Sequence, residues 1–278
     1  MTKPRQIAGP RRREFTERYG KWALVAGASE GLGAAYARAL AQRGLNLILA
    51  ARRQPLLDEL AADVHGTFGV EVHCHAGDLA IPEFLETLQA ACSSLDVGVV
   101  VFNATQAPVG GFVSTPVQDL MRVVDVNVRA PLALLRGLLP AMTLRSRGAV
   151  VLMTSLAGNQ GAPRIAAYAA SKAFARVLAE SVWHELKDQG IDVVACCAGA
   201  VRTPGYAAAA GKDAPGTLDP EDVVEQTLKA LCRGPVVIPG FVNRVAAVLL
   251  GRFLPRRAAI AIMASNTRSL GRTKEMTE

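Results

Sequence analysis

The sequence predicts an α/β protein built on one doubly wound parallel sheet of about seven strands, with helices on both faces. Three observations support this prediction. Short apolar runs alternate with longer helical patterns along the 278 residues, which is typical of repeated strand–helix–strand units. Runs such as Val97–Phe102 are apolar throughout, as expected of strands that are covered on both faces. Half of the residues are apolar, which is enough for the core of one large domain.

The expected elements follow one another without an internal repeat or a low-complexity segment. Strands are predicted at 23–27, 46–50, 70–75, 97–102, 149–154, 191–197 and 236–238. Helices are predicted at 33–43, 54–65, 82–93, 116–145, 164–189 and 220–232. Pro131 lies inside the longest helical stretch, where a proline is expected to kink the helix. The alanine-rich stretch 203–218 is predicted to be a mobile loop over the substrate.

A glycine-rich turn follows the first predicted strand and opens the first predicted helix. Its glycines are Gly27, Gly31 and Gly33, with Ser29 and Leu32 between them. Gly27 is expected to make the turn, Gly31 to let the backbone approach a pyrophosphate, and Gly33 to allow close packing of the helix. The phosphates would then meet the free N–H groups at the positive end of this helix. The order of strand, turn and helix therefore predicts a dinucleotide-binding site.

A tyrosine and a lysine one helical turn apart form the second motif. Tyr168 and Lys172 are four residues apart, so they project from the same face of a helix. An ammonium group beside a phenol favours the phenolate, which predicts a pKa of Tyr168 below its ordinary value of about 10. Ser155 lies thirteen residues before the tyrosine, at the carboxyl end of a predicted strand. The three side chains suit proton exchange with a carbonyl or alcohol oxygen.

Either motif alone can arise by chance, but together they resemble the short-chain dehydrogenase/reductase family, and most closely its 3-ketoacyl and 17-ketosteroid reductases. The resemblance runs from about Lys21 to about Pro239 and includes Asn103, which stands in the family's order and spacing. It implies a Rossmann-like sheet in the order 3-2-1-4-5-6-7, with the site at the carboxyl ends of the strands. It also implies a homodimer or homotetramer formed through the helices that carry Asn127 and Tyr168.

The resemblance assigns roles to individual residues. The catalytic set would be Ser155, Tyr168, Lys172 and Asn127, of which Asn127 would hold a water that links Lys172 to solvent. The cofactor-binding set would be Gly27, Ser29, Gly31, Leu32, Gly33, Arg52, Asp78, Leu79, Asn103, Tyr168, Lys172 and Thr203. Two positions depart from the family, because Thr105 replaces a glycine and Ala198 replaces a proline. Threonine restricts φ where glycine is free, so the backbone near the adenine ribose is expected to differ slightly.

The end of the second predicted strand decides between the two nicotinamide cofactors. An acidic residue there would accept the ribose 2′-hydroxyl of NAD and repel the 2′-phosphate of NADP. By family alignment Ala51 stands at that position and Arg52 follows it, and a guanidinium matches the geometry of a phosphate. We therefore expect NADP rather than NAD, with Arg52 ahead of Arg53 as the phosphate ligand. Two solvated arginines are the alternative interpretation, and Glu30 argues against NADP because its loop position is often basic in relatives that prefer NADP.

The positive charge is confined to the two ends of the chain. The sequence divides into a basic N-terminal tail (1–20), a dinucleotide-binding catalytic domain (21–239) and an apolar, basic C-terminal extension (240–278). Residues 1–21 carry a net charge of +5 and residues 233–278 a net charge of +6, whereas the whole chain carries +7. The intervening part is therefore acidic, with a net charge of −4.

The segment 241–263 is apolar with interspersed arginines, and it has two interpretations. Its composition suits a helix that lies on anionic lipid, which predicts peripheral contact with a membrane. It also suits packing over the mouth of the active site or against a partner subunit. Pro255 favours packing, because it divides the segment into two shorter pieces.

Other features exclude several classes of protein. The longest apolar runs fall short of the roughly 20 residues needed to span a bilayer, and the basic residues 1–13 lack the apolar stretch of a secretory signal. The five cysteines do not look like a disulfide framework, so a cytoplasmic location is expected. No groove-reading motif predicts nucleic-acid binding. No metal is expected, because His73 and His75 share a strand face but no second pair completes a tetrahedral site.

Together these observations predict an NADP-dependent oxidoreductase that interconverts a ketone and a secondary alcohol. An apolar ketoacyl, steroid or similar lipid-like carbonyl is the expected substrate, because the predicted loop 203–218 holds few polar residues. The alternative is a non-catalytic nucleotide-binding sensor or a membrane-associated scaffold. Such a protein would have no need of all four catalytic side chains.

Overall fold

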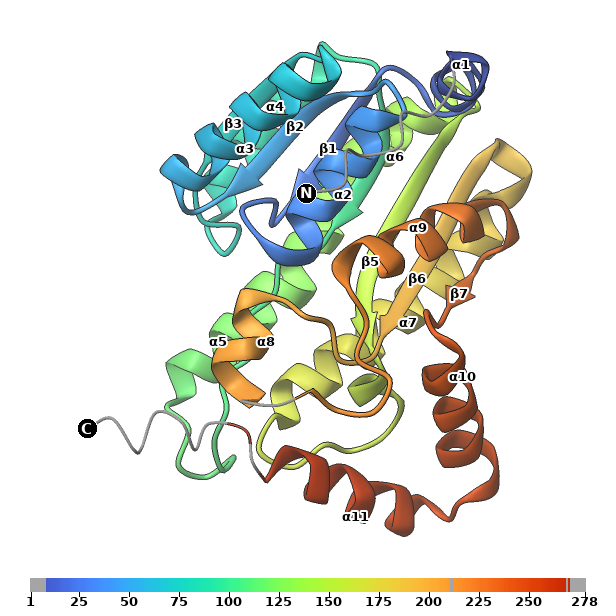
Figure 1. Ribbon diagram of the computed structural model, residues 1–278. Helices are drawn as coiled ribbons and strands as arrows, with labels where there is room; N and C mark the ends of the chain where they lie inside the picture. Colours follow the sequence, from blue (N-terminus) through green and yellow to red (C-terminus); the bar gives the residue numbers. More distant parts are fainter. Residues whose placement is uncertain (1–8, 211–212, 269, 271–278) are drawn as a thin grey trace.

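Seven parallel strands form one sheet at the centre of the protein (Figure 1). The computed structural model describes residues 9–210, 213–268 and 270. The strand order is β3-β2-β1-β4-β5-β6-β7, which confirms the expected topology. The strands are β1 (Trp22–Ala26), β2 (Asn46–Ala51), β3 (Val72–Ala76), β4 (Val97–Phe102), β5 (Gly148–Ser155), β6 (Ile191–Ala198) and β7 (Val236–Val237).

Helices cover both faces of this sheet and bury its central strands. One face packs against α2 (Gly31–Gln42), α3 (Gln54–Phe68) and α9 (Pro220–Ala230), and the other against α4 (Pro82–Ser93), α6 (Ala130–Leu144) and α7 (Ala166–Leu186). Neighbouring residues of a strand point to opposite faces, so Leu24 belongs to one apolar cluster and Val25 to the other. Both faces need apolar side chains, which explains why the strands do not alternate with polar residues.

The chain changes its direction of progress across the sheet at β1, which lies between β2 and β4. Ligands of open parallel sheets bind outside the carboxyl ends of the strands at such a switch point. The glycine-rich turn follows β1 at this place. The fold therefore predicts a ligand-binding site at the carboxyl ends of β1 and β4.

The long helix predicted at 116–145 is interrupted. It consists of α5 (Val117–Val124), a π turn η1 (Asp125–Arg129) and α6, with Pro131 in the first turn of α6. Because proline has no N–H group, Pro131 cannot donate to the carbonyl oxygen of Asn127, four residues earlier. The expected interruption near this proline is confirmed, although the irregular turn precedes Pro131 rather than kinking a single helix.

Part of the predicted N-terminal tail is a helix, α1 (Gly9–Tyr19), while residues 1–8 lie outside the described residues. Tyr19 is buried, and its hydroxyl donates a hydrogen bond to Asp192 Oδ2 over 2.7 Å. Arg18 pairs with the same carboxylate, and the ring of Phe15 packs against that of Tyr19. The end of α1 is therefore attached to the start of β6, and the core extends into the segment that the sequence assigned to a tail.

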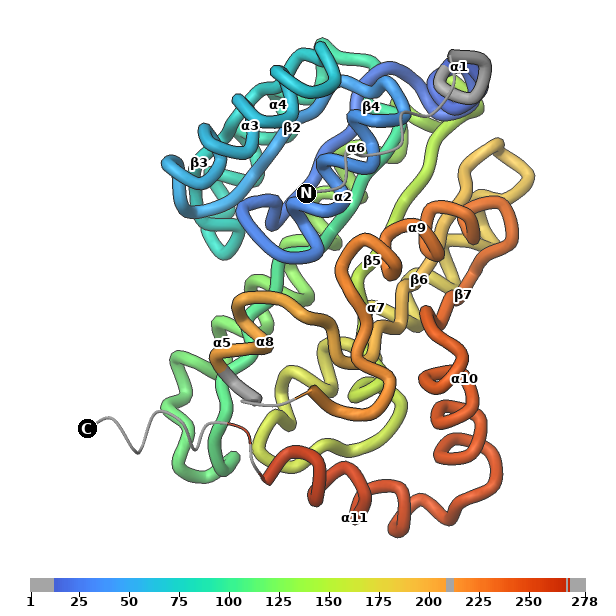
Figure 2. Tube along the Cα trace, in the orientation of Figure 1, coloured from blue at the N-terminus to red at the C-terminus, as the bar shows by residue number. Residues whose placement is uncertain are grey.

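Beyond β7 the chain forms an arm of two helices (Figure 2). These are α10 (Phe241–Val248) and α11 (Arg256–Thr267). The π turn η5 (Leu249–Phe253) continues α10, and Pro255 stands at the N-cap of α11. The predicted division of this segment at Pro255 is confirmed. None of the helices in the described part of the chain is both long and apolar enough to cross a membrane.

The stretch 203–218, predicted as a loop, holds the short helix α8 (Pro204–Ala210), and residues 211–212 lie outside the described residues. Arg202 pairs with Asp213 and with Asp219, on either side of those two residues. The remaining short helices are η2 (Leu156–Asn159), η3 (Lys187–Gln189) and η4 (Leu231–Arg233).

Candidate active site

Two glycines of the first motif lie where a side chain would not fit. Gly27 has a φ of +87°, and a Cβ there would lie 2.5 Å from the backbone nitrogen of Ala104. A Cβ on Gly33 would collide with the carbonyl oxygen of Gly27. Glycine is therefore required at both positions, because the turn after β1 is left-handed and α2 packs directly on it.

The N-terminus of α2 is free of side-chain caps. Its N-cap residue, Glu30, makes no side-chain hydrogen bond to the first turn. The first N–H groups of a helix have no partner inside the helix, and together with the helix dipole they bind phosphate. A Cβ on Gly31 would lie 2.9 Å from Cγ2 of Thr203, so the structure brings Thr203 to the phosphate turn. Leu32 packs its side chain against the core and offers only its backbone to a phosphate.

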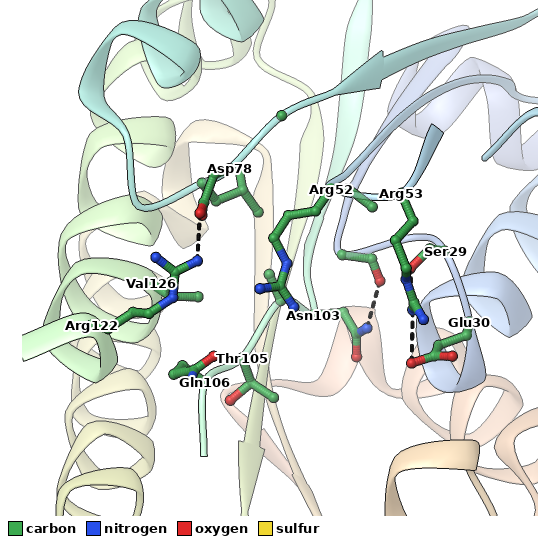
Figure 3. Close-up of a pocket in the computed structure, with 15 residues that line it drawn as sticks. Ser29, Glu30, Arg52, Arg53, Asp78, Asn103, Thr105, Gln106, Arg122 and Val126 are labelled. Carbon is green, nitrogen blue, oxygen red and sulfur yellow. Dashed lines mark hydrogen bonds and ion pairs between the residues drawn. The ribbon is translucent and has the colours of Figure 1, made fainter. Parts of the chain in front are cut away.

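A cavity of about 190 Å³ lies where β1, β2, β3 and β4 end (Figure 3). The predicted cofactor ligands that line it are Gly27, Ser29, Arg52, Asp78, Leu79 and Asn103. Asn103 Nδ2 donates to the carbonyl oxygen of Gly27 over 2.8 Å, which ties the loop after β4 to the phosphate turn. Thr105 also lines the cavity. Its φ is not positive, since Ser146 and Arg164 are the only described residues besides glycines with a positive φ, so the threonine needs no conformation that only glycine adopts easily.

Two consecutive arginines at the end of β2 have different surroundings (Figure 3). Arg53 Nη2 donates to Ser29 Oγ over 3.0 Å and lies 2.9 Å from Glu30 Oε1. Arg52 lines the cavity, is exposed, and forms no ion pair with any described residue. The contact with Arg53 compensates the charge of Glu30, the residue that argued against NADP in the sequence.

Arg122 is a cavity residue that the sequence did not reveal. It extends from α5 and pairs with Asp78 across the cavity (Figure 3). Burial raises the pKa of Asp78, but hydrogen bonds from the Ala80 N–H and from Arg122, together with the charge of Arg52, hold this pKa below its ordinary value. The carboxylate of Asp78 is therefore ionised and fixed in orientation. No sequence pattern signals this pair, whose members are 44 residues apart.

Tyr168 and Lys172 lie on one face of α7, beside the end of β5. The Lys172 ammonium nitrogen is 5.5 Å from the centre of the Tyr168 ring. Lys172 is buried, and its Nζ donates to the carbonyl oxygen of Met153 over 2.9 Å. Burial lowers the pKa of Lys172 to about 8. The lysine is therefore held beside the tyrosine by the backbone of β5.

The pKa of Tyr168 moves against the expectation drawn from its spacing to Lys172. Burial raises the pKa of Tyr168, because it disfavours the phenolate, and a hydrogen bond with the Ser155 hydroxyl lowers it by less. Lys172 donates to Met153 rather than to the phenol oxygen. The expected lowering of the tyrosine pKa by this lysine is therefore wrong for the chain by itself.

Ser155 is placed by the junction of β5 and η2. Its hydroxyl accepts a hydrogen bond from the backbone N–H of Ala157 over 3.2 Å, which caps η2. The same hydroxyl is hydrogen-bonded with Tyr168. A hydroxyl and a phenol that lie beside each other can both bind one further oxygen placed between them.

Asn127 is buried in the π turn η1 and connects three parts of the site. Its Oδ1 accepts from the Gln106 N–H over 2.8 Å, and its Nδ2 donates to the carbonyl oxygen of Gln106 and to Ser171 Oγ, each over 2.9 Å. Ser171 in turn donates to the carbonyl oxygen of Tyr168 over 2.7 Å. Asn127 thus joins the loop after β4 to α7, and its role in holding a water near Lys172 stays a prediction.

The histidine pair of β3 has other partners. His73 Nε2 lies 2.7 Å from Glu71 Oε1, and its ring packs against Trp22. Among the described residues, no group of three His, Cys, Asp or Glu side chains is placed to hold a metal ion.

Known proteins share this arrangement of sequence and fold. A family model described as short chain dehydrogenase matches residues 21–213. The chain belongs to the short-chain dehydrogenase family. A 7beta-hydroxysteroid dehydrogenase of Clostridium sardiniense is 33% identical over 233 residues, which cover 83% of this chain and 89% of that protein.

Two solved structures extend the likeness of this short-chain dehydrogenase to three dimensions. A structure from a study of 7beta-hydroxysteroid dehydrogenase stereoselectivity is 29% identical, with a TM-score of 0.84 over 89% of this chain and 98% of that chain. A short-chain dehydrogenase from Sphingobium yanoikuyae, in complex with NADPH, is 31% identical, with a TM-score of 0.74 over 82% and 92% of the two chains. As a member of this family, the protein is an NAD(P)-dependent oxidoreductase that interconverts a carbonyl and an alcohol.

The residues of this short-chain dehydrogenase fit a nicotinamide dinucleotide. The turn at Gly27 and Gly33 leaves no room for a Cβ, and the uncapped N-terminus of α2 offers donors to a pyrophosphate. The adjoining cavity carries the anchored carboxylate of Asp78 and the exposed guanidinium of Arg52. The N-terminus of α2, the carboxylate of Asp78 and the guanidinium of Arg52 therefore offer partners to the phosphates and the polar groups of a dinucleotide at the carboxyl ends of the strands.

The C-terminal arm of this short-chain dehydrogenase supplies contacts that the sequence left open. Met263 of α11 packs against an apolar cluster of the buried residues Ala157, Ala162, Ile165 and Ala169, and Tyr168 packs against the same cluster. Arg256 Nη1 donates to the carbonyl oxygen of Asn159 over 2.8 Å, which attaches the start of α11 to η2. Of the two interpretations of segment 241–263, packing at the active site therefore holds for α11.

Proposed function

We propose that this protein is an NADP-dependent ketone reductase, or the matching secondary-alcohol dehydrogenase, for a bulky apolar substrate. The observation that carries the proposal is the meeting of Ser155, Tyr168 and Lys172 at the carboxyl end of β5. The nicotinamide, when bound, supplies the hydride for the carbonyl carbon. The proton and the charge on the oxygen are handled by side chains of the chain.

Tyr168 is the proton donor during reduction. Burial raises its pKa, so the phenol stays protonated at neutral pH and can give its proton to the carbonyl oxygen as negative charge develops there. Ser155, which is hydrogen-bonded with the phenol, donates to the same oxygen. Both hydrogen bonds become stronger as negative charge develops on the oxygen. They therefore stabilise the transition state more than the bound ketone, and this difference accelerates the reaction.

Lys172 and Asn127 support this transfer. The ammonium group of Lys172 is 5.5 Å from the Tyr168 ring centre in the chain by itself, and in this proposal it stabilises the phenolate in the complex with the cofactor, after the proton has left. Lys172 also binds the nicotinamide ribose in this proposal. Asn127 holds the loop after β4 against α7 through Gln106 and Ser171, and it positions the water that returns a proton to the site.

NADP is the proposed cofactor, with NAD the weaker one. No acidic residue ends β2, where Ala51 is followed by Arg52, and the nearby carboxylate of Glu30 is paired with Arg53. The exposed guanidinium of Arg52 lines the cavity and is available for a 2′-phosphate. The relative from Sphingobium yanoikuyae binds NADPH, which supports this choice.

A bulky apolar carbonyl compound suits the surroundings of Tyr168. Ala162, Ile165 and Met263 provide apolar surface beside the tyrosine, and apolar walls with few polar groups select apolar ligands. Relatives with this fold act on hydroxysteroids by name. A ketosteroid or a lipid-like ketone of similar bulk is therefore the proposed substrate class.

The test is turnover with a panel of ketosteroids and short soluble ketones, followed by the absorbance of NADPH. The Tyr168→Phe variant keeps the ring and its packing but lacks the transferable proton. We expect it to lose activity by a factor on the order of 10² or more, while NADPH affinity, measured by fluorescence titration, stays nearly unchanged. If this variant turns over ketones as fast as the wild type, Tyr168 is not the proton donor. If the wild-type protein binds NADPH but turns over no ketone, a nucleotide-binding sensor becomes the better assignment.

We further propose that two or four copies assemble through α5, α6 and α7. Large apolar side chains are exposed on these helices at Val117, Met121, Val124, Leu132 and Val177. α5 packs against α7, so these side chains offer an apolar surface to a second copy. In a twofold dimer each copy would bury this apolar surface against the same surface of its partner, which would stabilise the helix that carries Tyr168 and Lys172.

A further inference from the structure

Helix α10 buries a polar side chain and exposes its apolar ones. Asn243 is buried, and its Nδ2 donates to the carbonyl oxygens of Gly216 and Pro239, each over 3.0 Å. A Cβ on Gly199 would lie 2.7 Å from Asn243 Oδ1, so the amide is packed against the chain just beyond β6. This anchor fixes which side of α10 faces the protein.

The opposite side of the helix is an apolar surface that continues into η5. It consists of the exposed residues Phe241, Val242, Val245, Val248, Leu249 and Phe253, which we call the α10 face. Their spacing follows the helical repeat and places them away from Asn243. Phe241 is 72% exposed and Phe253 is 70% exposed. Single exposed apolar residues are ordinary, but a contiguous face of large ones marks an interaction site.

Positive charge borders the α10 face and no negative charge offsets it within the arm. Arg244, Arg252 and Arg257 are exposed, and the sequence has no acidic residue between Glu225 and Glu275. Within the described ranges, none of these three arginines pairs with a carboxylate. The arm therefore combines exposed phenylalanines with uncompensated guanidinium groups.

We propose that the α10 face docks on an anionic lipid bilayer. The phenylalanines would enter the boundary between headgroups and acyl chains, and the arginines would contact lipid phosphates. A second copy of this chain is the other obvious occupant. A twofold contact would bring the same patch against itself, and Arg252 and Arg257 would then meet like charges with no acidic residue of the arm between them. An anionic surface attracts the same groups.

Docking in this way places the active site beside a source of apolar substrate, a consequence that rests on the proposed function. α11 follows the α10 face directly, and its Met263 packs against the same apolar cluster as Tyr168. One continuous arm therefore has the proposed lipid contact at one end and the apolar cluster beside the proton donor at the other. A ketone dissolved in the bilayer would need to travel only along this arm to reach Tyr168.

The experiment uses the full chain and two kinds of vesicle, one of phosphatidylcholine alone and one of equal parts phosphatidylcholine and phosphatidylglycerol. Sedimentation measures the bound fraction at low and at high salt. The variant Arg252→Gln/Arg257→Gln removes two charges from the arm. The control Arg13→Gln/Arg136→Gln removes two exposed charges elsewhere. A third variant, Phe241→Ser/Phe253→Ser, removes the two most exposed apolar side chains of the α10 face.

Wild type and control should bind the anionic vesicles and be released by salt. The two arm arginines should account for about thirtyfold in partitioning, from the usual contribution of a basic residue near an anionic membrane, and the phenylalanine variant should also bind less. Absence of wild-type binding at low salt overturns the proposal, as does equal binding by all variants. Loss of a dimer in the phenylalanine variant, without vesicle binding by wild type, assigns the face to a second copy. Turnover of a soluble ketone, measured in parallel, tests the proposed function separately.

Discussion

Arg52 and Arg53 are neighbours in the sequence with separate tasks in the proposed cofactor site. Arg52→Ala should weaken NADPH binding by about 1.5–3 kcal/mol, the usual worth of a hydrogen bond to a charged group, and should leave NADH binding much less affected. Arg53→Ala should weaken NADPH binding less, by releasing the carboxylate of Glu30 from its ion pair. Titration of each variant with both cofactors measures the effects, and Arg38→Ala, on another surface pair, is the control. Equal losses for NADPH and NADH in Arg52→Ala would make that arginine structural.

The buried ammonium of Lys172 should make stability depend on pH. Burial lowers the pKa of Lys172 from 10.5 to about 8 in the folded chain. Between these values the unfolded chain binds a proton that the folded chain has released, so this group makes stability rise with pH. Lys172→Met removes the effect. The free energy of unfolding of Lys172→Met, minus that of the wild type, should therefore be highest near pH 7 and fall by about 3 kcal/mol towards pH 10.5. Urea unfolding of both proteins across this range measures the difference, and a constant difference would contradict the assigned pKa.

Residues that act through local spacing could be predicted from the sequence, and residues that act through long-range contacts could not. Gly27 and Gly33 are recognisable because a turn and a helix start impose their conformation within a few positions. Arg122 is not recognisable, because its ion pair with Asp78 depends on how the fold places α5 relative to the loop that follows β3. The pKa of Tyr168 differs from the prediction for the same reason, since burial, which the spacing of two residues does not reveal, raises this pKa more than the hydrogen bond with Ser155 lowers it.

At the scale of elements, α11 should influence substrate choice through Met263. Met263→Ala removes apolar contact beside Tyr168, so kcat/KM for a bulky ketone should change by about tenfold relative to a small soluble ketone. Ile262→Ala is the matched control, because Ile262 is the neighbouring residue on α11 and is 40% exposed. Steady-state kinetics with both ketones measures the ratio. An equal effect of the two substitutions would mean that α11 acts only on stability.

The strands were predictable as elements, whereas the irregular parts of helices were not. A strand covered on both faces has an apolar sequence that is visible directly, as in β4 and β5. Pro131 signals an interruption at η1, but neither the form of this π turn nor the hydrogen bonds of Asn127 to Gln106 and Ser171 in other segments can be predicted from the sequence. The sequence predicts a tail where the structure has the helix α1, because the attachment of this helix through Tyr19 and Asp192 arises only in three dimensions.

At the scale of the whole molecule, α1 and the arm of α10 and α11 lie at opposite ends of the sheet (Figure 1). α1 is attached beside the amino end of β6 through Asp192. The arm of α10 and α11 lies at the carboxyl end, where Met263 packs against the same apolar cluster as Tyr168 (Figure 1). Arg256 of the arm is therefore attached beside the active site through the carbonyl oxygen of Asn159, whereas Arg18 of α1 pairs with Asp192 at the other end of the sheet. The sequence revealed the charge distribution, but only the fold relates it to function.

Assembly through α5, α6 and α7 gives the last prediction. Met121 and Val177 are 51% and 60% exposed, although both are large and apolar. A carboxylate buried in an apolar interface without a partner is strongly unfavourable, so Met121→Glu/Val177→Glu should convert the wild-type assembly to a monomer of 29.3 kDa. Leu144→Glu is the control, because Leu144 ends α6 and is 88% exposed. It should keep the assembly.

Light scattering coupled to gel filtration measures the mass of each variant, and circular dichroism verifies that each one is folded. The variant Phe241→Ser/Phe253→Ser should also keep the wild-type mass, because the α10 face is proposed to meet lipid rather than a second copy. A monomeric wild type, or an assembly that survives both glutamates, would contradict an interface on α5, α6 and α7. Since α7 carries Tyr168 and Lys172, a folded monomer should also unfold at lower temperature and reduce ketones more slowly, because the helix that holds both groups loses its partner.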